Sequence, residues 1–422
     1  MKLLAIGLFV MMLTGLLFIP KYRLPIAIAS AIVFVLSGIV PYTRLIYVID
    51  FNVLMMIGGT MGLVVLFIDS KMPARLADLL VNKTARLSIA IVALAAFAGI
   101  ISAFVDNVAT VLMVAPVAIE IAKKAEVSPV GMVIAIAISS NLQGAATLVG
   151  DTTSILLGGY ANMTFLDFFI YQGRIGLFFV VQIGAIIATM YLYLVLRNLR
   201  QKIHVGEIQE VDDLIPTFLL LTMIILLIAA SFITQRPALT NGMICVGLFL
   251  VGLIRQLLIH KKFSVVQKVW IQLDFVTLGV LVCLFIAVGG LVEAGIIDDI
   301  SQWIVLVTRS NRFLIFTTLV FGSVILSAFI DNIPYVATML PVVTSMATLL
   351  QTDPTLFYFG LLVGATLGGN LTPIGASANI AAMGMLRKAG YEVKTTTFMK
   401  MGVPFTMLAV MTGYLLLYLI WY

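Results

Sequence analysis

A six-residue motif occurs twice in this chain, and the second copy follows the first at a spacing of 225 residues. Residues 102–107 read SAFVDN and residues 327–332 read SAFIDN, each inside an apolar run and each followed by a proline, Pro116 or Pro341. The same spacing relates Thr147, Gly150 and Ser154 to Thr372, Gly375 and Asn379. A register that persists for more than fifty residues indicates an internal repeat. The chain should therefore fold as two related halves.

Hydropathy indicates the surroundings of these halves. Only 10% of the 422 residues are charged, 62% are hydrophobic and the mean hydropathy is +1.16. A helix needs about 20 apolar residues to cross roughly 30 Å of hydrocarbon, and runs of that order recur from end to end. The composition predicts an all-α polytopic protein integral to the lipid bilayer. The net charge of +6 comes from basic residues scattered in short loops, which favours a role in membrane topology and disfavours nucleic-acid binding.

Each half is expected to contain five membrane spans and one hairpin. In the first half, residues 1–200, we predict spans at 3–19, 24–40, 47–68 and 168–196, a connector at 71–84, a hairpin at 87–123 and a broken span at 129–160. In the second half, residues 214–422, we predict spans at 214–233, 239–259, 272–292 and 402–421, a connector at 297–310, a hairpin at 313–350 and a broken span at 356–386. The run 87–123 is too long for one crossing and has a polar centre, which is typical of a re-entrant hairpin.

An odd number of crossings in each half predicts that the second half is inverted relative to the first. Under this topology, only six of the 25 basic residues lie on the side of the two termini: Lys2, Arg44, Arg174, Arg236, Arg309 and Arg312. Lys and Arg accumulate in cytoplasmic loops. We therefore expect the central connector, residues 201–213, to be cytoplasmic and both termini to face outward, in a bacterial-type inner or plasma membrane.

The tips of the two hairpins, at Asp106 and Asp331, are the strongest candidates for chemistry. An aspartate at the bilayer centre costs about 2.5–3.5 kcal/mol, which packing does not explain; capping of the following helix is the alternative reading. Hairpin tips that meet broken spans near the midplane form ion and substrate sites in carriers. Carboxylate, amide and hydroxyl oxygens suit a small cation, and desolvation of the carboxylate would let a proton replace that cation.

Further candidates lie close to the tips. Ser102 and Ser327 precede the aspartates by four residues, where each could add a hydroxyl ligand or bond to its own helix. The broken spans contribute Thr147, Gly150, Asp151, Asn370, Thr372, Gly375 and Asn379. Asp151 has no acidic counterpart, because Ala376 occupies the matching position. It could couple protons or substrate to transport, or it could stabilise a local turn.

These motifs resemble those of the ion transporter superfamily, in particular its branch of arsenite permeases, NhaD-type antiporters and the melanosomal P protein, also called citrate-transporter-like. The resemblance rests on SAFVDN, SAFIDNIPYVATMLPV, GAATLVGD and GGNLTPIGASAN, and it covers essentially the whole chain. It implies inverted repeats, a homodimer with scaffold and transport domains, and elevator-type movement. Gln143 departs from the pattern, since relatives usually have glycine there.

The resemblance also implies two cation sites. The first would use Ser102, Asp106 and Asn107 with carbonyls near Thr147 and Gly150. The second would use Ser327, Asp331 and Asn332 with carbonyls near Thr372 and Gly375. Sodium-coupled dicarboxylate carriers of this superfamily have Ser-Asn-Thr at the tips, whereas this chain has Asp-Asn-Val and Asp-Asn-Ile. The extra negative charge and the missing hydroxyl disfavour a dianion as the substrate.

We therefore expect a secondary active transporter of a small ion, not an enzyme, that links Na⁺ to H⁺ by antiport. No cofactor is expected beyond these coupling ions, and Na⁺ would bind at Asp106, Asn107, Asp331 and Asn332. The alternative is an ion-coupled carrier of anions or oxyacids, such as arsenite, citrate or other carboxylates. A channel or a structural protein is a third class. An accessory ATPase subunit would be needed for a pump, since the chain lacks a GxxxxGK[ST] loop.

Overall fold

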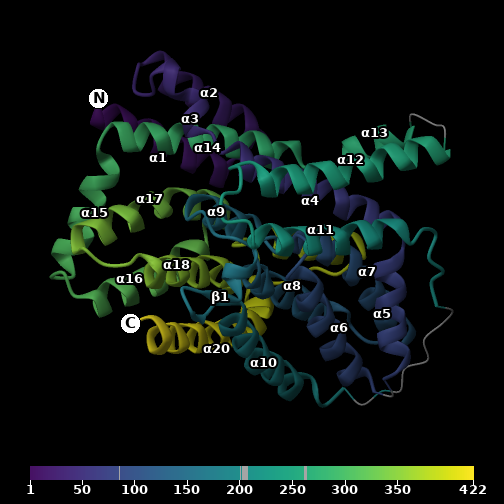
Figure 1. The fold of residues 1–422 in the computed structure, drawn as a ribbon. Helices are drawn as coiled ribbons and strands as arrows, with labels where there is room; N and C mark the ends of the chain where they lie inside the picture. The colour runs from purple at the N-terminus through teal and green to yellow at the C-terminus, as the bar shows by residue number, and fades with distance from the viewer. Residues whose placement is uncertain (85, 200, 202–207, 261–263) are drawn as a thin grey trace.

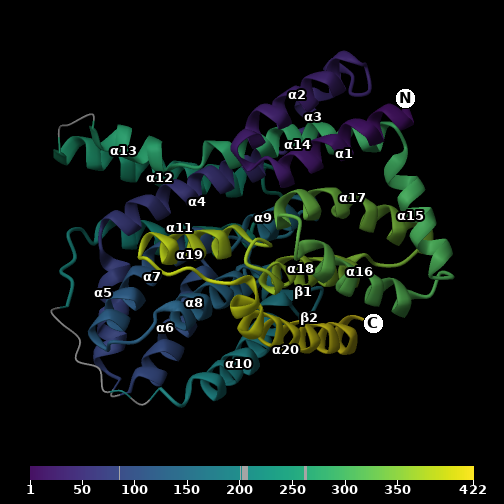
Figure 2. The same cartoon turned by 180° about the vertical axis from the view of Figure 1, so that it is seen from behind.

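The chain forms a bundle of helices in the computed structural model, with both termini at one end of the molecule (Figure 1). The structure describes residues 1–84, 86–199, 201, 208–260 and 264–422. Residues 202–207 of the predicted connector lie outside the described residues. The helices that flank the connector, α10 and α11, have their connector ends at the opposite end of the molecule from the termini (Figures 1 and 2).

The first half is helical apart from a short β-hairpin. Its helices are α1 (Lys2–Phe18), α2 (Arg23–Leu36), α3 (Leu45–Val48), α4 (Phe51–Asp69), α5 (Met72–Asn82), α6 (Leu87–Ser102), α7 (Asn107–Lys124), α8 (Val130–Gln143), α9 (Thr152–Tyr160) and α10 (Leu177–Leu196), with 3₁₀ turns at Pro20–Tyr22, Tyr42–Arg44, Gly144–Ala146 and Leu166–Phe168. Strands β1 (Ile170–Tyr171) and β2 (Arg174–Ile175) pair antiparallel. The predicted span 168–196 therefore begins as a hairpin, because Gln172 and Gly173 take positive φ angles and turn the chain before α10.

The second half repeats this order of helices. It comprises α11 (Ile215–Ser231), α12 (Thr240–His260), α13 (Ser264–Gln272), α14 (Phe275–Glu293), α15 (Ile296–Val307), α16 (Arg312–Ser327), α17 (Asn332–Leu350), α18 (Thr355–Gly368), a 3₁₀ turn at Gly369–Leu371, α19 (Ser377–Lys388) and α20 (Thr395–Trp421). Helices α4 and α14 both have 19 residues, α6 and α16 both have 16, and α8 and α18 both have 14. Helix α20 begins seven residues before the predicted span 402–421.

Equivalent helices also begin in the same way. Asp50 caps α4 by accepting a hydrogen bond from the Val53 N–H at 3.0 Å, and Asp274 caps α14 by accepting one from the Thr277 N–H at 3.0 Å. A carboxylate at this position satisfies an amide that has no partner within the helix. The matched helices α5 and α15 nevertheless lie at opposite ends of the molecule (Figures 1 and 2).

Six of the described helices are long and apolar enough to cross a membrane: α4, α10, α12 (Thr240–Ile259), α14, α17 and α20. The count rises to eight if each of two bent pairs is one span, namely α1 with 20–36, bent by 118°, and α15 with α16, bent by 117°. Ten crossings are therefore not reached by this criterion. Three predicted spans contain shorter apolar helices, at Val130–Ala146, Ile215–Ser231 and Thr355–Leu371, and so does the predicted hairpin 87–123, at Leu87–Ser102.

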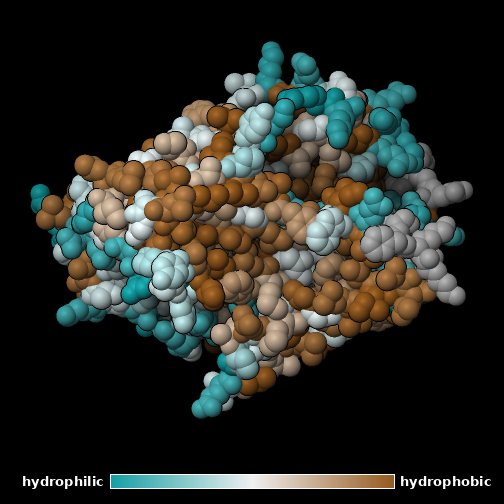
Figure 3. Space-filling view, turned by 90° about the horizontal axis from the view of Figure 1, so that it is seen from above, coloured by the Kyte–Doolittle hydropathy of each residue, from teal (hydrophilic) through white to brown (hydrophobic). Residues whose placement is uncertain are grey.

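The outer surface suits a bilayer. Figure 3 shows a broad hydrophobic field with hydrophilic residues gathered towards its margins. Large apolar side chains are exposed on the surface, for example Ile254 at 55%, Trp270 at 63% and Trp303 at 64%. Contact with lipid tails accounts for exposed apolar side chains in a membrane protein. This chain is accordingly an integral membrane protein.

Candidate functional site

The two hairpin tips line one cavity of about 460 Å³. Asp106 and Asn107 of the first tip face it, together with Asp331 and Asn332 of the second tip and Asp151 of the first break. Asp274, at the start of α14, is a fourth carboxylate in the wall. All residues that line this cavity lie in the described part of the chain, and none of them is Lys, Arg or His. The cavity is therefore strongly acidic.

The first tip is the turn between α6 and α7. Oδ1 of Asp106 accepts hydrogen bonds from the backbone N–H groups of Val108 at 3.0 Å and Ala109 at 3.1 Å. Both bonds use one oxygen, and no hydrogen bond among the described residues involves Oδ2. Asp106 thus caps α7 and lines the acidic cavity at the same time, so the two readings of this residue are compatible.

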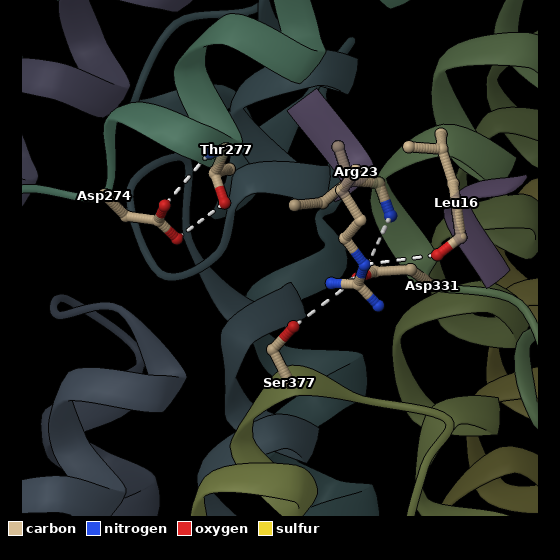
Figure 4. Close-up of polar contacts among 7 residues, drawn as sticks. Leu16, Arg23, Asp274, Thr277, Asp331 and Ser377 are labelled. Carbon is tan, nitrogen blue, oxygen red and sulfur yellow. Dashed lines mark hydrogen bonds and ion pairs between the residues drawn. The ribbon is translucent and has the colours of Figure 1, made fainter. Parts of the chain in front are cut away.

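The second tip, between α16 and α17, has different neighbours. Oδ1 of Asp331 accepts a hydrogen bond from the Ile333 N–H at 3.3 Å. Oδ2 accepts one from the Ser377 hydroxyl at 3.4 Å and lies 3.8 Å from Nη1 of Arg23 (Figure 4). Arg23 also faces a second cavity of about 370 Å³. Asp274 and Asp331 line both this second cavity and the acidic cavity.

Each tip is fastened to a broken span by the same bonds. The hydroxyl of Thr147 donates to the Ala103 carbonyl, and the hydroxyl of Thr372 donates to the Ala328 carbonyl at 2.5 Å. Ser102, fully buried, accepts a bond from the Ser140 hydroxyl at 3.0 Å. These threonines therefore position the tip backbone against the unwound segment of each half.

Ser327 is also fully buried and makes the corresponding contacts in the second half. Its hydroxyl donates to the Ala365 carbonyl at 2.5 Å and contacts the Asn332 side chain at 2.5 Å. Neither Ser327 nor Ser102 is bonded to its own helix in these contacts; each joins a hairpin to a neighbouring helix. The side-chain amide of Asn332, oriented to donate, would reach the Ser327 hydroxyl and the carbonyls of Ala365 and Gly375.

Carbonyl oxygens converge at both breaks. A Cβ atom at Gly150 would lie 2.7 Å from the Gly144 oxygen, 2.9 Å from the Ala103 oxygen and 3.0 Å from the Ser102 oxygen. At Gly375 the matching distances are 2.6 Å to Gly369, 2.8 Å to Ala328 and 2.8 Å to Ser327. Each glycine therefore faces three backbone oxygens, two from a tip and one from a break. Only glycine leaves this space open.

Two buried asparagines, Asn141 and Asn370, join the two halves, and a third, Asn379, bonds within the second half. Asn141 accepts a hydrogen bond from the Asn107 amide at 2.8 Å and donates one to the Thr366 carbonyl at 2.8 Å. In the opposite direction, Asn370 donates to the Ile138 carbonyl at 2.9 Å. Asn379 donates to the carbonyls of the second break, while its own side-chain oxygen is buried without a hydrogen-bond partner among the described residues. An unpaired buried oxygen is a candidate cation ligand.

Asp151 and Gln143 have clear local contacts. Asp151 caps α9 by accepting bonds from the Thr152 N–H at 2.8 Å and the Thr153 hydroxyl at 2.9 Å, and it also lines the acidic cavity. Gln143 and Gln182 of α10 donate to each other, at 3.0 Å and 2.7 Å. The additional amide of Gln143 therefore ties the first broken span to α10.

Sequence reasoning missed part of this site. Ser140 and Asn141 interrupt an apolar helix, and buried polar residues there were a usable signal. Asp274 lies near the start of the predicted span 272–292, where its local pattern indicates a helix cap and nothing more. Arg23 lies in a short basic loop, and its position beside Asp331 follows from packing that no local pattern records.

A third cavity, of about 570 Å³, lies at the other ends of α4 and α14. The C-terminal part of α4, residues 61–68, shares the acidic cavity with the start of α14 at Asp274 and Thr277. The start of α4, at Asp50, shares the third cavity with the end of α14 at Glu293. The two matched helices therefore run in opposite directions between the two cavities.

The comparison with known families covers almost the whole chain. A family model described as "Citrate transporter" matches residues 6–266 and 256–422. The chain belongs to the citrate transporter family. The resemblance predicted from the motifs is thereby confirmed, and the family and its members are transporters and not enzymes.

Relatives of this citrate transporter family member include bacterial and mammalian proteins. It is 29% identical to a 46 kDa membrane protein of Mycobacterium leprae (strain TN) over 314 residues, which cover 73% of this chain and 72% of the relative. It is 30% identical to an uncharacterized transporter of Mycobacterium tuberculosis (strain ATCC 25618 / H37Rv), with 75% and 74% covered. The P protein of Sus scrofa is 26% identical, with 88% of this chain and 53% of that protein covered.

Two solved transporters share the fold. The Alcanivorax borkumensis YdaH transporter superposes with a TM-score of 0.58 at 16% identity, covering 89% of this chain and 87% of that chain. MtrF of Neisseria gonorrhoeae superposes with a TM-score of 0.57 at 15% identity, covering 92% and 83%. At these identities, the likeness concerns the fold alone.

Proposed function

We propose that this protein is a secondary active transporter that exchanges Na⁺ for H⁺ at its two hairpin tips. The observation that carries the proposal is the acidic cavity, where Asp106, Asp151, Asp274 and Asp331 meet without a basic residue in the wall. Such a cavity attracts cations and repels free anions. Family membership supports transport but does not select the ion.

The first cation site would be formed by Asp106 with the carbonyl oxygens that face Gly150. The second would be formed by Asp331 with the carbonyl oxygens that face Gly375 and the unpaired oxygen of Asn379. Hard oxygen ligands of this kind suit a small cation. A carboxylate in such a site accepts a proton when the cation leaves, which couples the two fluxes.

Alternating access would use the two cavities at opposite ends of α4 and α14. The antiparallel course of these matched helices and the positions of α5 and α15 support an inverted repeat (Figures 1 and 2). We propose that the hairpins and broken spans move as a unit past α2, α4 and α14, in the manner of an elevator. The proposal includes a homodimer, a cytoplasmic connector and outward-facing termini.

The test is proton flux in proteoliposomes that contain a pH-reporting dye. Pulses of sodium, lithium or potassium chloride should change the internal pH with selectivity among the cations. Asp106→Asn and Asp331→Asn should each abolish the change, because an amide cannot exchange a proton for a cation. Asp299→Asn serves as the control, since this carboxylate is 56% exposed and pairs with Lys2. Folded tip variants that transport as well as the parent protein would overturn the proposal.

Transport of citrate or a similar carboxylate is the second candidate, and the family description favours it. In that case, the cations bound at the two tips would drive transport of the carboxylate substrate. Counterflow of labelled citrate in the same proteoliposomes separates the two functions. Counterflow without any cation-dependent pH change would favour the carboxylate carrier.

A further inference from the structure

The two tips share a sequence motif but have neighbours of opposite charge. Across the acidic cavity, Asp106 has the carboxylate Asp151 as a neighbour in the wall, whereas Asp331 has Arg23 at 3.8 Å. Asp106 takes part in no ion pair among the described residues. The repeat therefore does not extend to the electrostatics of the two tips.

Arg23 is held in this position by its own neighbours. It begins α2, directly after the 118° bend from α1, and its Nε donates to the Leu16 carbonyl at 3.2 Å. Figure 4 shows the guanidinium next to the Asp331 carboxylate, with a dashed line from Arg23 to the Leu16 carbonyl. The side chains of Arg23 and Asp331 are 31% and 26% exposed, so the pair is hydrated and can separate.

Among the described residues, Asp106 has no counterpart of this arginine as an ion-pair partner. Helices α4 and α14 begin 224 residues apart, and the position 224 residues after Arg23 is Gly247, in α12. In the first half, the position that matches Ser377, which also bonds to Asp331, is Thr152, the residue after Asp151. The two tips therefore differ by one basic side chain, Arg23, and by one acidic side chain, Asp151, whose counterpart is Ala376.

We propose that Arg23 is a tethered counter-ion that competes with the transported cation for the carboxylate of Asp331. In this conformation, Arg23 neutralises the second tip while the first tip remains open to a cation. Because Arg23 belongs to α2 and Asp331 to a hairpin, movement of the hairpin past α2 would break the pair and free the second site. Arg23 is thus a positioning residue that makes cation binding at one tip depend on conformation. The inference rests on the proposed function.

The test measures the Na⁺ dependence of thermal unfolding of the purified full chain, at constant ionic strength with choline as the replacement cation. A ligand at concentration L that binds only the folded state stabilises it by RT ln(1 + L/Kd), so the dependence of stability on Na⁺ concentration yields the half-saturating concentration, Kd. Arg23→Gln should lower the half-saturating Na⁺ concentration about two- to five-fold, the range expected for loss of a partly exposed ion pair. Arg23→Lys should restore most of the parental value.

Lys21→Gln is the matched control, because it removes one positive charge at a position two residues before Arg23. The Lys21 side chain is exposed and lies over the ring of Tyr22. In an Asp331→Asn background, Arg23→Gln should change nothing further. Equal effects of Arg23→Gln and Lys21→Gln, or an effect that survives in the Asp331→Asn background, would overturn the inference. Loss of citrate counterflow in Arg23→Gln with an unchanged Na⁺ response would assign Arg23 to an anion instead. Absence of any Na⁺ response in the parent protein would overturn the proposed function first.

Discussion

Gly375 offers the sharpest test of the carbonyl arrangement at the second break. Replacement by alanine would place a Cβ 2.6 Å from the Gly369 oxygen and 2.8 Å from the oxygens of Ala328 and Ser327. Gly375 is absent from the described residues with positive φ, so the backbone itself accepts alanine and the effect is steric. All three neighbours are backbone atoms, which cannot rotate away.

The magnitude follows from the cost of overpacking. Forcing an extra methyl into a filled space costs about 1–3 kcal/mol. If the three oxygens move outward to relieve this strain, they no longer converge on a cation. Bringing them back together then reduces the free energy of Na⁺ binding by the same amount. At about 1.4 kcal/mol per tenfold change, Gly375→Ala should weaken Na⁺ binding roughly 5- to 150-fold.

The assay is again the Na⁺ dependence of thermal unfolding, with Na⁺-driven proton flux as a second measurement. Gly384→Ala is the control, since no atom lies within 4 Å of a Cβ at that position. Gly384 is inside α19, where alanine stabilises a helix by about 0.5–1 kcal/mol relative to glycine. The control should therefore keep the parental half-saturating concentration. The reasoning is refuted if folded Gly375→Ala protein binds Na⁺ with parental affinity.

Three further predictions concern the scaffold around the site. Gly59→Ala should lower the unfolding temperature, because its Cβ would lie 2.4 Å from a backbone carbon of α12, whereas Gly58→Ala, with its nearest contact at 3.7 Å, should not. Thr147→Val should cost about 1–3 kcal/mol of unfolding free energy and reduce transport, since it leaves a buried tip carbonyl without its hydroxyl donor; parental transport would contradict this. Asp213→Ala should increase proteolysis near the connector, because it removes the 2.5 Å pair with Arg255, and unchanged proteolysis would count against it.

The sequence alone determined the class of protein and predicted its candidate site. Long apolar runs with few charges indicate membrane-spanning helices, because a chain with so many of them would expose too much apolar surface to water as a soluble protein. A motif that recurs at a fixed spacing predicts two related halves, and Asp106 and Asp331 stand out because a buried charge is costly. Each of these features depends only on residue types and their positions along the chain, so it can be read without a structure.

Only the tertiary structure decided which of these groups meet. That Asp106, Asp151, Asp274 and Asp331 line one cavity depends on helices far apart in the chain, as does the bond from Asn141 to the Thr366 carbonyl. The placement of Arg23 beside Asp331 depends on the bend between α1 and α2 and on their packing against α14. Long-range neighbours arise from the packing of whole helices, and that packing leaves no pattern in the sequence around any one residue.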